Sequence, residues 1–461
     1  MMTQNIRQIL QRQREFFSGG ATRDIAFRKK QLILLEKIIR KNEQRIMQAL
    51  FEDLRKPEFE SYAAEIGILY PEIRTAAKNI HAWAKPRRVS TPVLHFLASS
   101  YVYQEPYGVT LIIGPWNYPF QLTIAPLIAA MSAGNCAILK PSELSPATSG
   151  VIAHLISEHF DPAYIAVFEG GVDETKSLLE EKFDYIFFTG GTAVGKVIMN
   201  AAARHLTPVT LELGGKSPTI VHRDAHLEYA AKRIAWGKYF NAGQTCLAPD
   251  YLLVHREIKE RFINIFKKTI ISFYGDDPSK SPDYARIIND RHFSRISALM
   301  KSGTIIHGGQ TDPGTRYIAP TVLDNVRLED PIMKEEIFGP LFPVISYENI
   351  EEALNIINAM PRPLALYLFT NDTKIETLVL RNTSFGGGCI NDTVSHVGST
   401  NLPFGGIGDS GMGLYHGKAG FDTFSHQRSV LKRSNLIDMK LRYPPYGKRV
   451  NLLKKLFRII G

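Results

Sequence analysis

Short β-rich runs alternate with helical patterns along most of this chain, and this alternation constrains the fold more than any other feature. Strand patterns occupy residues 109–113, 136–139 and 185–188, and helical patterns occupy residues 121–132, 147–160 and 194–204. Strand–helix–strand units of this kind are joined by right-handed crossovers and build a mostly parallel sheet with helices on both faces. The sequence therefore predicts an α/β, doubly wound, Rossmann-like domain.

The pattern begins again after Glu212, which indicates a second α/β lobe. The expected strands lie at 219–221, 251–254, 342–345 and 365–369, and the expected helices lie at about 225–240 and 350–357. An amphipathic helical face lies upstream of the first strand and consists of Leu35, Ile39, Ile46 and Leu50. Pro57 is a nearby stop signal for this helix.

The composition excludes several broad classes of protein. The chain has 461 residues, of which 44% are hydrophobic and 22% charged, as in a globular protein of two or three lobes. Its net charge of +10 comes from scattered residues without a nucleic-acid-binding motif, so we expect no nucleic-acid partner. Three cysteines, and an N-terminus without an apolar signal-peptide core, favour a reducing compartment and hence the cytoplasm.

Residues 106–139 contain no charged side chain, and their number would admit a membrane span. The stretch is interrupted by Gly114, Pro115, Pro119, Pro126 and Gly134. Lipid offers no partners for the backbone groups that such breaks release. We therefore expect a buried strand, loop and helix.

Cys246 ends the run Asn241-Ala242-Gly243-Gln244-Thr245-Cys246, which follows a long amphipathic helical pattern. A glycine close to the cysteine lets the backbone turn tightly and present the thiol. A lone cysteine is more often a small buried apolar residue. A thiolate nucleophile also needs a base and a site for an oxyanion.

Glu212 stands between two leucines on an expected buried strand, where a carboxylate is costly unless it is paired or protonated. One interpretation is an internal ion pair with Lys216. The other is a general base whose pKa is raised by desolvation. The residue alone does not decide between them.

Asn117 follows the strand pattern at 109–113, and binding sites in doubly wound sheets collect at the carboxyl ends of strands. Its amide can donate to a developing oxyanion. A turn asparagine bonded to its own backbone is the equally plain alternative.

A glycine-rich turn follows the strand pattern at 185–188 and opens the next helix, reading Phe188-Thr189-Gly190-Gly191-Thr192-Ala193-Val194-Gly195-Lys196. Such a turn can place a pyrophosphate against a helix N-terminus. It nearly matches a nucleoside-triphosphate P-loop, but Val197 stands where that loop needs Ser or Thr for magnesium. The turn is also not the dinucleotide fingerprint, which needs G-x-G-x-x-G. The mismatch at Val197 argues against an ATPase, and a phosphotransferase or NTPase is the alternative function class.

Seven segments, in order, resemble the aldehyde dehydrogenase superfamily over nearly the whole chain. They are Gly114-Pro115-Trp116-Asn117, Lys140-Pro141-Ser142-Glu143, Phe188-Thr189-Gly190, Leu211-Glu212-Leu213-Gly214-Gly215-Lys216, Gly243-Gln244-Thr245-Cys246, Glu336-Ile337-Phe338-Gly339-Pro340 and Pro403-Phe404-Gly405-Gly406. The short N-terminus and the ending Arg442-Tyr443-Pro444-Pro445-Tyr446 are most similar to the class 3 branch.

The resemblance implies a role for each matching residue. Cys246 is the expected nucleophile, Glu212 the base that activates water, and Asn117 a donor to the oxyanion together with the Cys246 N–H. The expected cofactor contacts are Ile113, Trp116, Lys140, Glu143, Thr189, Gly190, Gly191, Gly195, Glu336 and Phe338. Glu143 favours NAD, because a carboxylate accepts from a ribose 2′-hydroxyl and repels a 2′-phosphate, although class 3 relatives also use NADP. Gly191 departs from relatives that have Ser or Asn there. No metal site is expected.

The same resemblance implies four regions and a homodimer. Residues 1–86 and 108–211 would form the NAD(P)-binding domain and 212–418 the catalytic domain. An oligomerisation arm would comprise 87–107 with 419–445, followed by a basic tail at 446–461. The tail is amphipathic, and we expect it to pack on the protein, with peripheral membrane contact as the alternative.

Three questions of chemistry remain open at this point. A thioester on Cys246 could be resolved by phosphate or coenzyme A instead of water, and Glu212 favours water. A catalytically inactive binding protein would usually lose the nucleophile, which this chain retains. The aromatic content suits medium-chain or aromatic aldehydes, and it does not identify the substrate. Cys136 and Cys389 are expected to have no chemistry.

Overall fold

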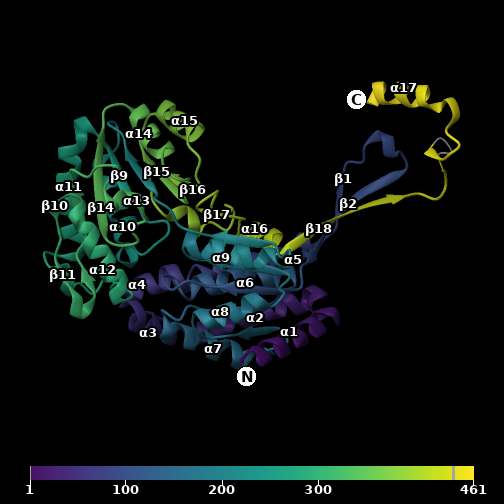
Figure 1. Cartoon of the computed structure of the whole chain (residues 1–461), viewed down its shortest axis with the longest axis horizontal. Helices are drawn as coiled ribbons and strands as arrows, with labels where there is room; N and C mark the ends of the chain where they lie inside the picture. The colour runs from purple at the N-terminus through teal and green to yellow at the C-terminus, as the bar shows by residue number, and fades with distance from the viewer. Residues whose placement is uncertain (1, 439–441, 461) are drawn as a thin grey trace.

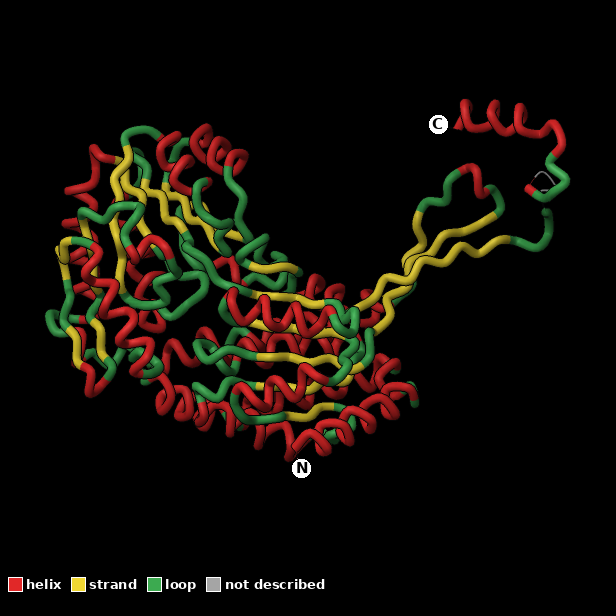
Figure 2. Tube along the Cα trace, viewed as in Figure 1, coloured by secondary structure: helices red, strands yellow, loops and turns green. Residues whose placement is uncertain are grey.

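Two mostly parallel sheets and one projecting arm organise the chain (Figure 1). The computed structural model describes residues 2–438 and 442–460. Helices cover the sheets, and the arm carries the C-terminal helix away from both lobes (Figure 2). The predicted α/β class with two lobes and an arm is confirmed.

The first sheet has six strands in the order β17-β7-β6-β3-β4-β5, of which only β17 runs antiparallel. Its strands are β3 (Val109–Ile113), β4 (Cys136–Lys140), β5 (Ile165–Val167), β6 (Tyr185–Thr189), β7 (Val209–Glu212) and β17 (Gly411–Met412). Every residue of β3, β4 and β6 is buried, which explains their continuous apolar runs, because parallel strands are covered on both faces.

Most helices around this sheet come from the first half of the chain. They are α1 (Met2–Ser18), α2 (Ile25–Lys41), α3 (Glu43–Leu54), α4 (Glu58–Ser61), α5 (Leu69–Ala84), α6 (Gln121–Ala133), α7 (Pro146–His159), α8 (Val172–Glu180), α9 (Thr192–Ala203) and α16 (Gly417–Thr423). The expected apolar face at 35–50 is buried, but it belongs to two helices that meet at Asn42.

Helix α6 explains the charge-free stretch at 106–139. All thirteen residues of α6 are buried, so no polar face is needed. The helix ends at Gly134, whose φ of 97° is left-handed, and a Cβ placed there would lie 2.5 Å from the Arg28 guanidinium. This position therefore needs glycine both for its conformation and for the approach of Arg28.

The second sheet has seven strands in the order β10-β13-β14-β9-β8-β15-β16, antiparallel only between β10 and β13. Its strands are β8 (Pro218–Val221), β9 (Tyr251–His255), β10 (Thr304–His307), β13 (Thr321–Asp324), β14 (Leu341–Tyr347), β15 (Ala365–Phe369) and β16 (Gly387–Ile390), with β11 (Thr311–Asp312) and β12 (Tyr317–Ile318) as a separate pair. Its helices are α10 (Leu227–Tyr239), α11 (Lys259–Tyr274), α12 (Asp290–Leu299), α13 (Pro331–Lys334), α14 (Ile350–Asn358) and α15 (Thr373–Asn382).

The arm is a three-stranded antiparallel sheet of β1 (Arg87–Val89), β2 (Ala98–Pro106) and β18 (Ser425–Arg433). Strand β2 is central, and its register with β18 runs from Ser425 opposite Pro106 to Arg433 opposite Ala98. Strands from distant parts of the sequence therefore form one ribbon that leaves the lobes (Figure 1). Residues 439–441 of the predicted arm lie outside the described residues.

Helix α17 (Val450–Ile460) lies beyond the arm, and its described apolar side chains are exposed. Val450, Leu452, Leu453 and Phe457 are each at least 44% exposed. The expectation that this helix packs on its own chain is therefore wrong for these side chains. No helix within residues 2–438 and 442–460 is long and apolar enough to cross a membrane.

Candidate active site

The order of the first sheet brings three predicted residues to one edge. Strand β3 is flanked by β4 and β6, so the chain proceeds from β3 in one direction and later returns to its other side. Ligands bind at such a switch point, outside the carboxyl ends of the strands. The Asn117 loop follows β3, the Gly190 turn follows β6, and Glu212 ends neighbouring β7.

Cys246 is presented by an unusual turn after α10. Asn241, Ala242 and Gly243 have φ values of 53°, 52° and 74°, so three successive residues are left-handed. A Cβ on Gly243 would lie 2.3 Å from the Gly339 carbonyl oxygen. This close approach requires glycine and delivers the half-buried thiol of Cys246 to the edge of the first sheet.

Asn117 is held at both its backbone and its side chain. Its carbonyl accepts from Lys56 Nζ at 2.9 Å and from Asn241 Nδ2 at 2.9 Å. Its own Nδ2 donates to the Gln244 carbonyl at 3.1 Å, in the loop that carries Cys246. A carboxamide has two N–H groups, so the second is available to a substrate oxygen. The turn-asparagine alternative fits less well, because these bonds run between distant segments.

Glu212 is only 2% exposed, and neither carboxylate oxygen has a hydrogen-bond partner among the described residues. Burial raises its pKa well above the ordinary value. The alternative ion pair with Lys216 is wrong, because the Lys216 ammonium contacts Asp250 and donates to the Ile332 carbonyl at 2.8 Å. Glu212 thus retains the free carboxyl that a proton acceptor needs.

The Cys246 thiol is a weak acid in this structure. Burial raises its pKa, and the negative charges of Glu336 and Glu212 act in the same direction. The sequence prediction left two routes to the thiolate, a lowered pKa or transient deprotonation. The structure favours the second, so loss of the proton must accompany the reaction.

Two cavities meet at Cys246, and Glu212, Thr189 and Leu122 line both with it. The first, which we call the cleft, has a volume of about 460 Å³ and contains the glycine turn. The second, which we call the chamber, is narrower, with a volume of about 80 Å³. The chamber is lined mainly by apolar and aromatic residues, including Ile68, Tyr118, Phe240, Val397, Phe404 and Tyr415.

Six predicted cofactor residues line the cleft: Trp116, Thr189, Gly190, Gly191, Glu336 and Phe338. Gly191 caps the N-terminus of α9, and a Cβ placed there would meet nothing within 4 Å. The N-terminus of α9 is thus uncovered at the cleft, as an anion site requires. The Trp116 and Phe338 rings pack edge to face, 5.2 Å between centroids.

Glu336 enters the cleft against Gly214. A Cβ on Gly214 would lie 2.0 Å from Glu336 Oε2, so the glycine allows the carboxylate to reach its place. Burial raises the pKa of Glu336 to about 8. The half-buried carboxylate of Glu336, the open helix N-terminus and the paired rings match the hydroxyl, phosphate and ring components of a dinucleotide.

The other four predicted cofactor residues lie outside the lining of the cleft. Ile113 is a buried residue of β3, and Gly195 packs in α9 where a Cβ would be 2.7 Å from Leu213. Buried Lys140 donates to the Pro141 carbonyl at 2.8 Å and lies 3.6 Å from the part-exposed carboxylate of Glu143. These two side chains form a charged pair beyond the cleft.

Sequence reasoning did not single out several residues of both cavities. His292 and Arg295 line the cleft, and the His292 ring lies 5.0 Å from the Trp116 ring. In the chamber, the Tyr118 and Thr245 hydroxyls are hydrogen-bonded at 2.6 Å. Tyr118 and Thr245 each adjoin a predicted catalytic residue, a signal that could have been used, whereas α12 carries no motif.

The other two cysteines lie outside the linings of the cleft and the chamber. Cys136 is buried in β4, and burial raises the pKa of its thiol to about 12. Cys389 lies on β16 with its sulfur 3.4 Å from His396 Nδ1. The expectation that neither takes part in the chemistry stays a prediction.

Comparison with known proteins gives consistent matches over almost the full length. A model of the aldehyde dehydrogenase family matches residues 2–430. The 4,4'-diaponeurosporen-aldehyde dehydrogenase of Staphylococcus aureus is 48% identical over 96% of this chain and 97% of its own. The "aldehyde dehydrogenase, dimeric NADP-preferring" of Rattus norvegicus is 47% identical over 96% of this chain and 98% of its own.

Solved structures agree. The substrate-bound state of Staphylococcus aureus AldH has a TM-score of 0.96 at 48% identity, covering 98% of this chain and 99% of that one. An indole-3-acetaldehyde dehydrogenase in complex with NAD+ has a TM-score of 0.86 at 28% identity, covering 94% and 89%.

Proposed function

The chain belongs to the aldehyde dehydrogenase family, whose members oxidise aldehydes to carboxylic acids with NAD or NADP, and we propose that Cys246 carries this reaction through a thiohemiacetal and a thioester. One observation carries the proposal: Cys246 and Glu212 lie in the wall shared by the cleft and the chamber. An aldehyde in the chamber and a dinucleotide in the cleft would both reach the same sulfur.

The first step forms a bond between Cys246 Sγ and the aldehyde carbon. The thiol proton leaves to solvent as the carbon–sulfur bond forms, because the raised pKa of the thiol leaves little thiolate beforehand. The carbonyl π electrons move to oxygen, where the free N–H of Asn117 and the Cys246 backbone N–H stabilise the charge. Bound NAD(P)+ supplies the acceptor for the hydride that leaves the same carbon, and a thioester on Cys246 results.

The second step hydrolyses the thioester. Glu212 removes a proton from water, the hydroxide adds to the acyl carbon, and the carbon–sulfur bond breaks. The carboxylic acid is released and the Cys246 thiolate recovers a proton. Glu212 suits this role because its carboxylate has no other partner among the described residues. Water is favoured over phosphate or coenzyme A for the same reason.

The chamber supports uncharged aldehydes with a hydrocarbon or aromatic body as substrates. Glu212 is the only charged residue among those that line it, and a second anion there would be neither paired nor hydrated. Medium-chain and benzylic aldehydes meet this requirement.

The residues of the cleft, together with Lys140 and Glu143 beyond it, would hold the dinucleotide as the sequence predicted. The N-terminus of α9 would take the pyrophosphate, Glu336 the nicotinamide ribose, and Lys140 with Glu143 the adenosine ribose. We propose NAD as the preferred cofactor, with NADP accepted. The ammonium of Lys140 lies beside Glu143 and could meet a 2′-phosphate. Comparable kcat/KM with both cofactors would show that Glu143 moves aside.

The arm and tail support two further proposals about partners. The chain would form a homodimer through the arm, as the relative named dimeric suggests, and mass measurement in solution tests this. The exposed basic helix α17 would either pack on the partner copy or contact anionic lipid. Flotation with anionic vesicles at low salt decides, and an absence of co-flotation removes the lipid alternative.

The free cysteines support a cytoplasmic location, and the four-region division also remains a proposal.

Replacement of Asn117 tests the catalytic proposal. Loss of one oxyanion donor lowers kcat by about 100- to 1000-fold, so Asn117→Ala should fall in this range. Cofactor binding, measured by the fluorescence of the reduced nicotinamide, should persist. Near-native turnover in this variant would remove Asn117 from the mechanism.

A further inference from the structure

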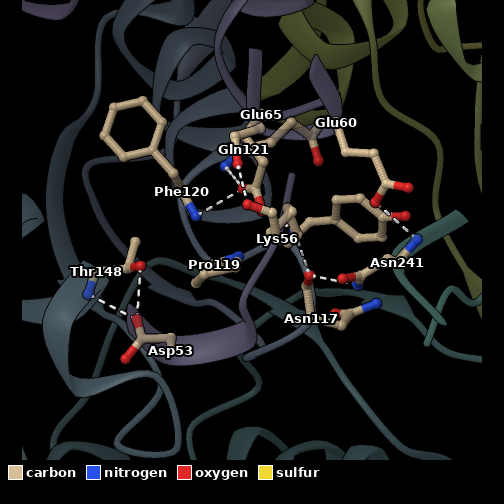
Figure 3. A network of polar contacts seen from close by, with 12 residues as sticks. Asp53, Lys56, Glu60, Glu65, Asn117, Pro119, Phe120, Gln121, Thr148 and Asn241 are labelled. Atoms are coloured by element: carbon tan, nitrogen blue, oxygen red, sulfur yellow. Dashed lines mark hydrogen bonds and ion pairs between the residues drawn. The ribbon is translucent and has the colours of Figure 1, made fainter. Parts of the chain in front are cut away.

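A buried ion pair lies directly behind the loop that carries Asn117 (Figure 3). The side chains of Lys56 and Glu65 are both 0% exposed, and Lys56 Nζ contacts Glu65 Oε1. Removing two charges from water is costly, and an apolar pair of equal volume is often as stable. A buried pair at this position therefore points to something other than stability.

The two members of the pair bind two parts of one short segment. Lys56 Nζ donates to the Asn117 carbonyl at 2.9 Å. Glu65 Oε2 accepts from the backbone N–H of Phe120 at 3.1 Å and from that of Gln121 at 3.0 Å, at the start of α6. The ion pair thus joins the Asn117 backbone to a helix that is buried over its full length.

The segment is irregular, although the Tyr118 hydroxyl is also hydrogen-bonded to that of Thr245 and the Trp116 ring packs on Phe338. Residues 114–120 form neither helix nor strand, and Pro115 and Pro119 cannot donate backbone hydrogen bonds. The Asn117 carbonyl has a second donor in Asn241 Nδ2, and the Asn241 N–H is bound in turn by Glu60 Oε2 at 2.9 Å. Lys56 and Asn241 thus meet at the Asn117 carbonyl from two separate parts of the chain (Figure 3).

The position of Asn117 matters because the two N–H groups of its carboxamide have different partners. One donates to the Gln244 carbonyl, and the other is left for the oxyanion. A displacement of about 1 Å in such a donor can cost on the order of 100-fold in rate.

We propose that Lys56 is a positioning residue of the oxyanion site, which holds the Asn117 backbone so that the free amide N–H faces the carbonyl oxygen bound at Cys246. The proposal rests on the proposed function. Lys56 does not contact the substrate. It acts through Asn117, and Glu65 neutralises its charge and ties it to α6.

A double-mutant cycle tests this role. The variant Lys56→Met/Glu65→Gln removes the charged pair while leaving an oxygen at residue 65 for the N–H groups of Phe120 and Gln121. We expect kcat to fall by about 10- to 100-fold, with little change in aldehyde KM or in cofactor Kd. The same double change in an Asn117→Ala background should cost less than about two-fold, because the group being positioned is already gone.

A merely structural role predicts a different result. Equal losses of kcat in the native and Asn117→Ala backgrounds, or native kcat in the double variant, would overturn the proposal. Glu65→Gln alone is the matched control, because it keeps the Lys56 donor to Asn117. It should lower Tm, and its kcat should fall less than that of the double variant.

A second variant covers the case in which the double variant does not fold. Lys56→Arg keeps a cation beside Glu65 but moves the donor, and it should reduce kcat in the native background and much less in the Asn117→Ala background. If Asn117→Ala itself is fully active, the proposed function has failed instead, so the two failures are distinguishable.

Discussion

The cleft and the chamber meet at one sulfur, yet they are built from different parts of the chain. The cleft presents glycine backbone, a helix N-terminus and the carboxylate of Glu336, which the neighbouring Gly214 admits. The chamber presents apolar and aromatic side chains from distant segments. A binding site made of backbone groups is disturbed by substitutions that add a side chain. A site made of side chains is disturbed by substitutions that truncate one. The two cavities should therefore respond to opposite kinds of substitution.

The largest effect should come from Cys246, the proposed nucleophile, which lines both cavities. Cys246→Ser replaces the nucleophile with a hydroxyl that a neighbouring carboxylate cannot ionise, and kcat should fall by at least about 10⁴-fold. Cofactor binding should remain. Cys389→Ser is the matched control, since Cys389 lines neither cavity, and its kcat should be native. Undiminished turnover after serine replaces Cys246 would end the thioester proposal.

Glu212 also lines both cavities, and its replacement should separate the two steps. In Glu212→Gln, steady-state kcat should fall by about 100- to 10,000-fold, because the thioester forms but water is not activated. Rapid mixing should still show a burst of reduced cofactor. A loss of the burst together with kcat would assign Glu212 to the first step alone.

The pH profile gives an independent check on Glu212. The residue acts as a base only when ionised, and burial raises its pKa well above the ordinary 4.5. The kcat of the native protein should therefore rise with pH through that raised pKa, and activity should be lost as the pH falls through it. The Gln variant should lack this limb. A native profile that is flat down to pH 5 contradicts the raised pKa.

A smaller effect is expected from adding a charge to the cleft. Gly191→Asp has room for its side chain but places an anion at the N-terminus of α9, so the KM for NAD should rise about 10-fold. Gly191→Ser, of similar size and no charge, should be near native. The aldehyde KM should not change in either variant, and a change would mean that the cavities are not independent.

The smallest effect is expected from removing a side chain from the chamber. Val397→Ala withdraws apolar contact, and kcat/KM for a medium-chain aldehyde should fall by about four-fold for each methylene of contact with the substrate that is lost. The KM for NAD should be native. Val194→Ala, at an exposed valine of α9, is the matched control and should change neither constant. An equal fall for acetaldehyde would show that Val397 does not contact the hydrocarbon body.

The cleft was more predictable from sequence than the chamber, for a physical reason. Asn117, Gly190 and Glu212 each follow or end a buried strand, and strand order places such positions together. The residues next to them in the sequence therefore also lie at the same edge of the sheet. Val397, Phe404 and Tyr415 reach the chamber through loops whose paths no local pattern specifies.

Pairing between charged residues was the least predictable feature. Lys216 was the natural partner for Glu212 by proximity in the sequence, but it turns to Asp250 in the second lobe. Lys56 and Glu65 gave no signal, because neither lies in a motif and their contact depends on the fold between them. Helix α17 was expected to be buried, although nothing in its pattern specified a surface to receive it.

That a single sulfur borders two separate spaces has a consequence for turnover. The aldehyde and the dinucleotide would reach the sulfur from different cavities, so neither would have to wait for the other to leave. An acyl group still attached through the chamber would leave the cleft free for spent dinucleotide to depart and fresh dinucleotide to arrive. The rate-limiting step can then lie in the chamber or in the cleft without blocking ligand exchange in the other cavity.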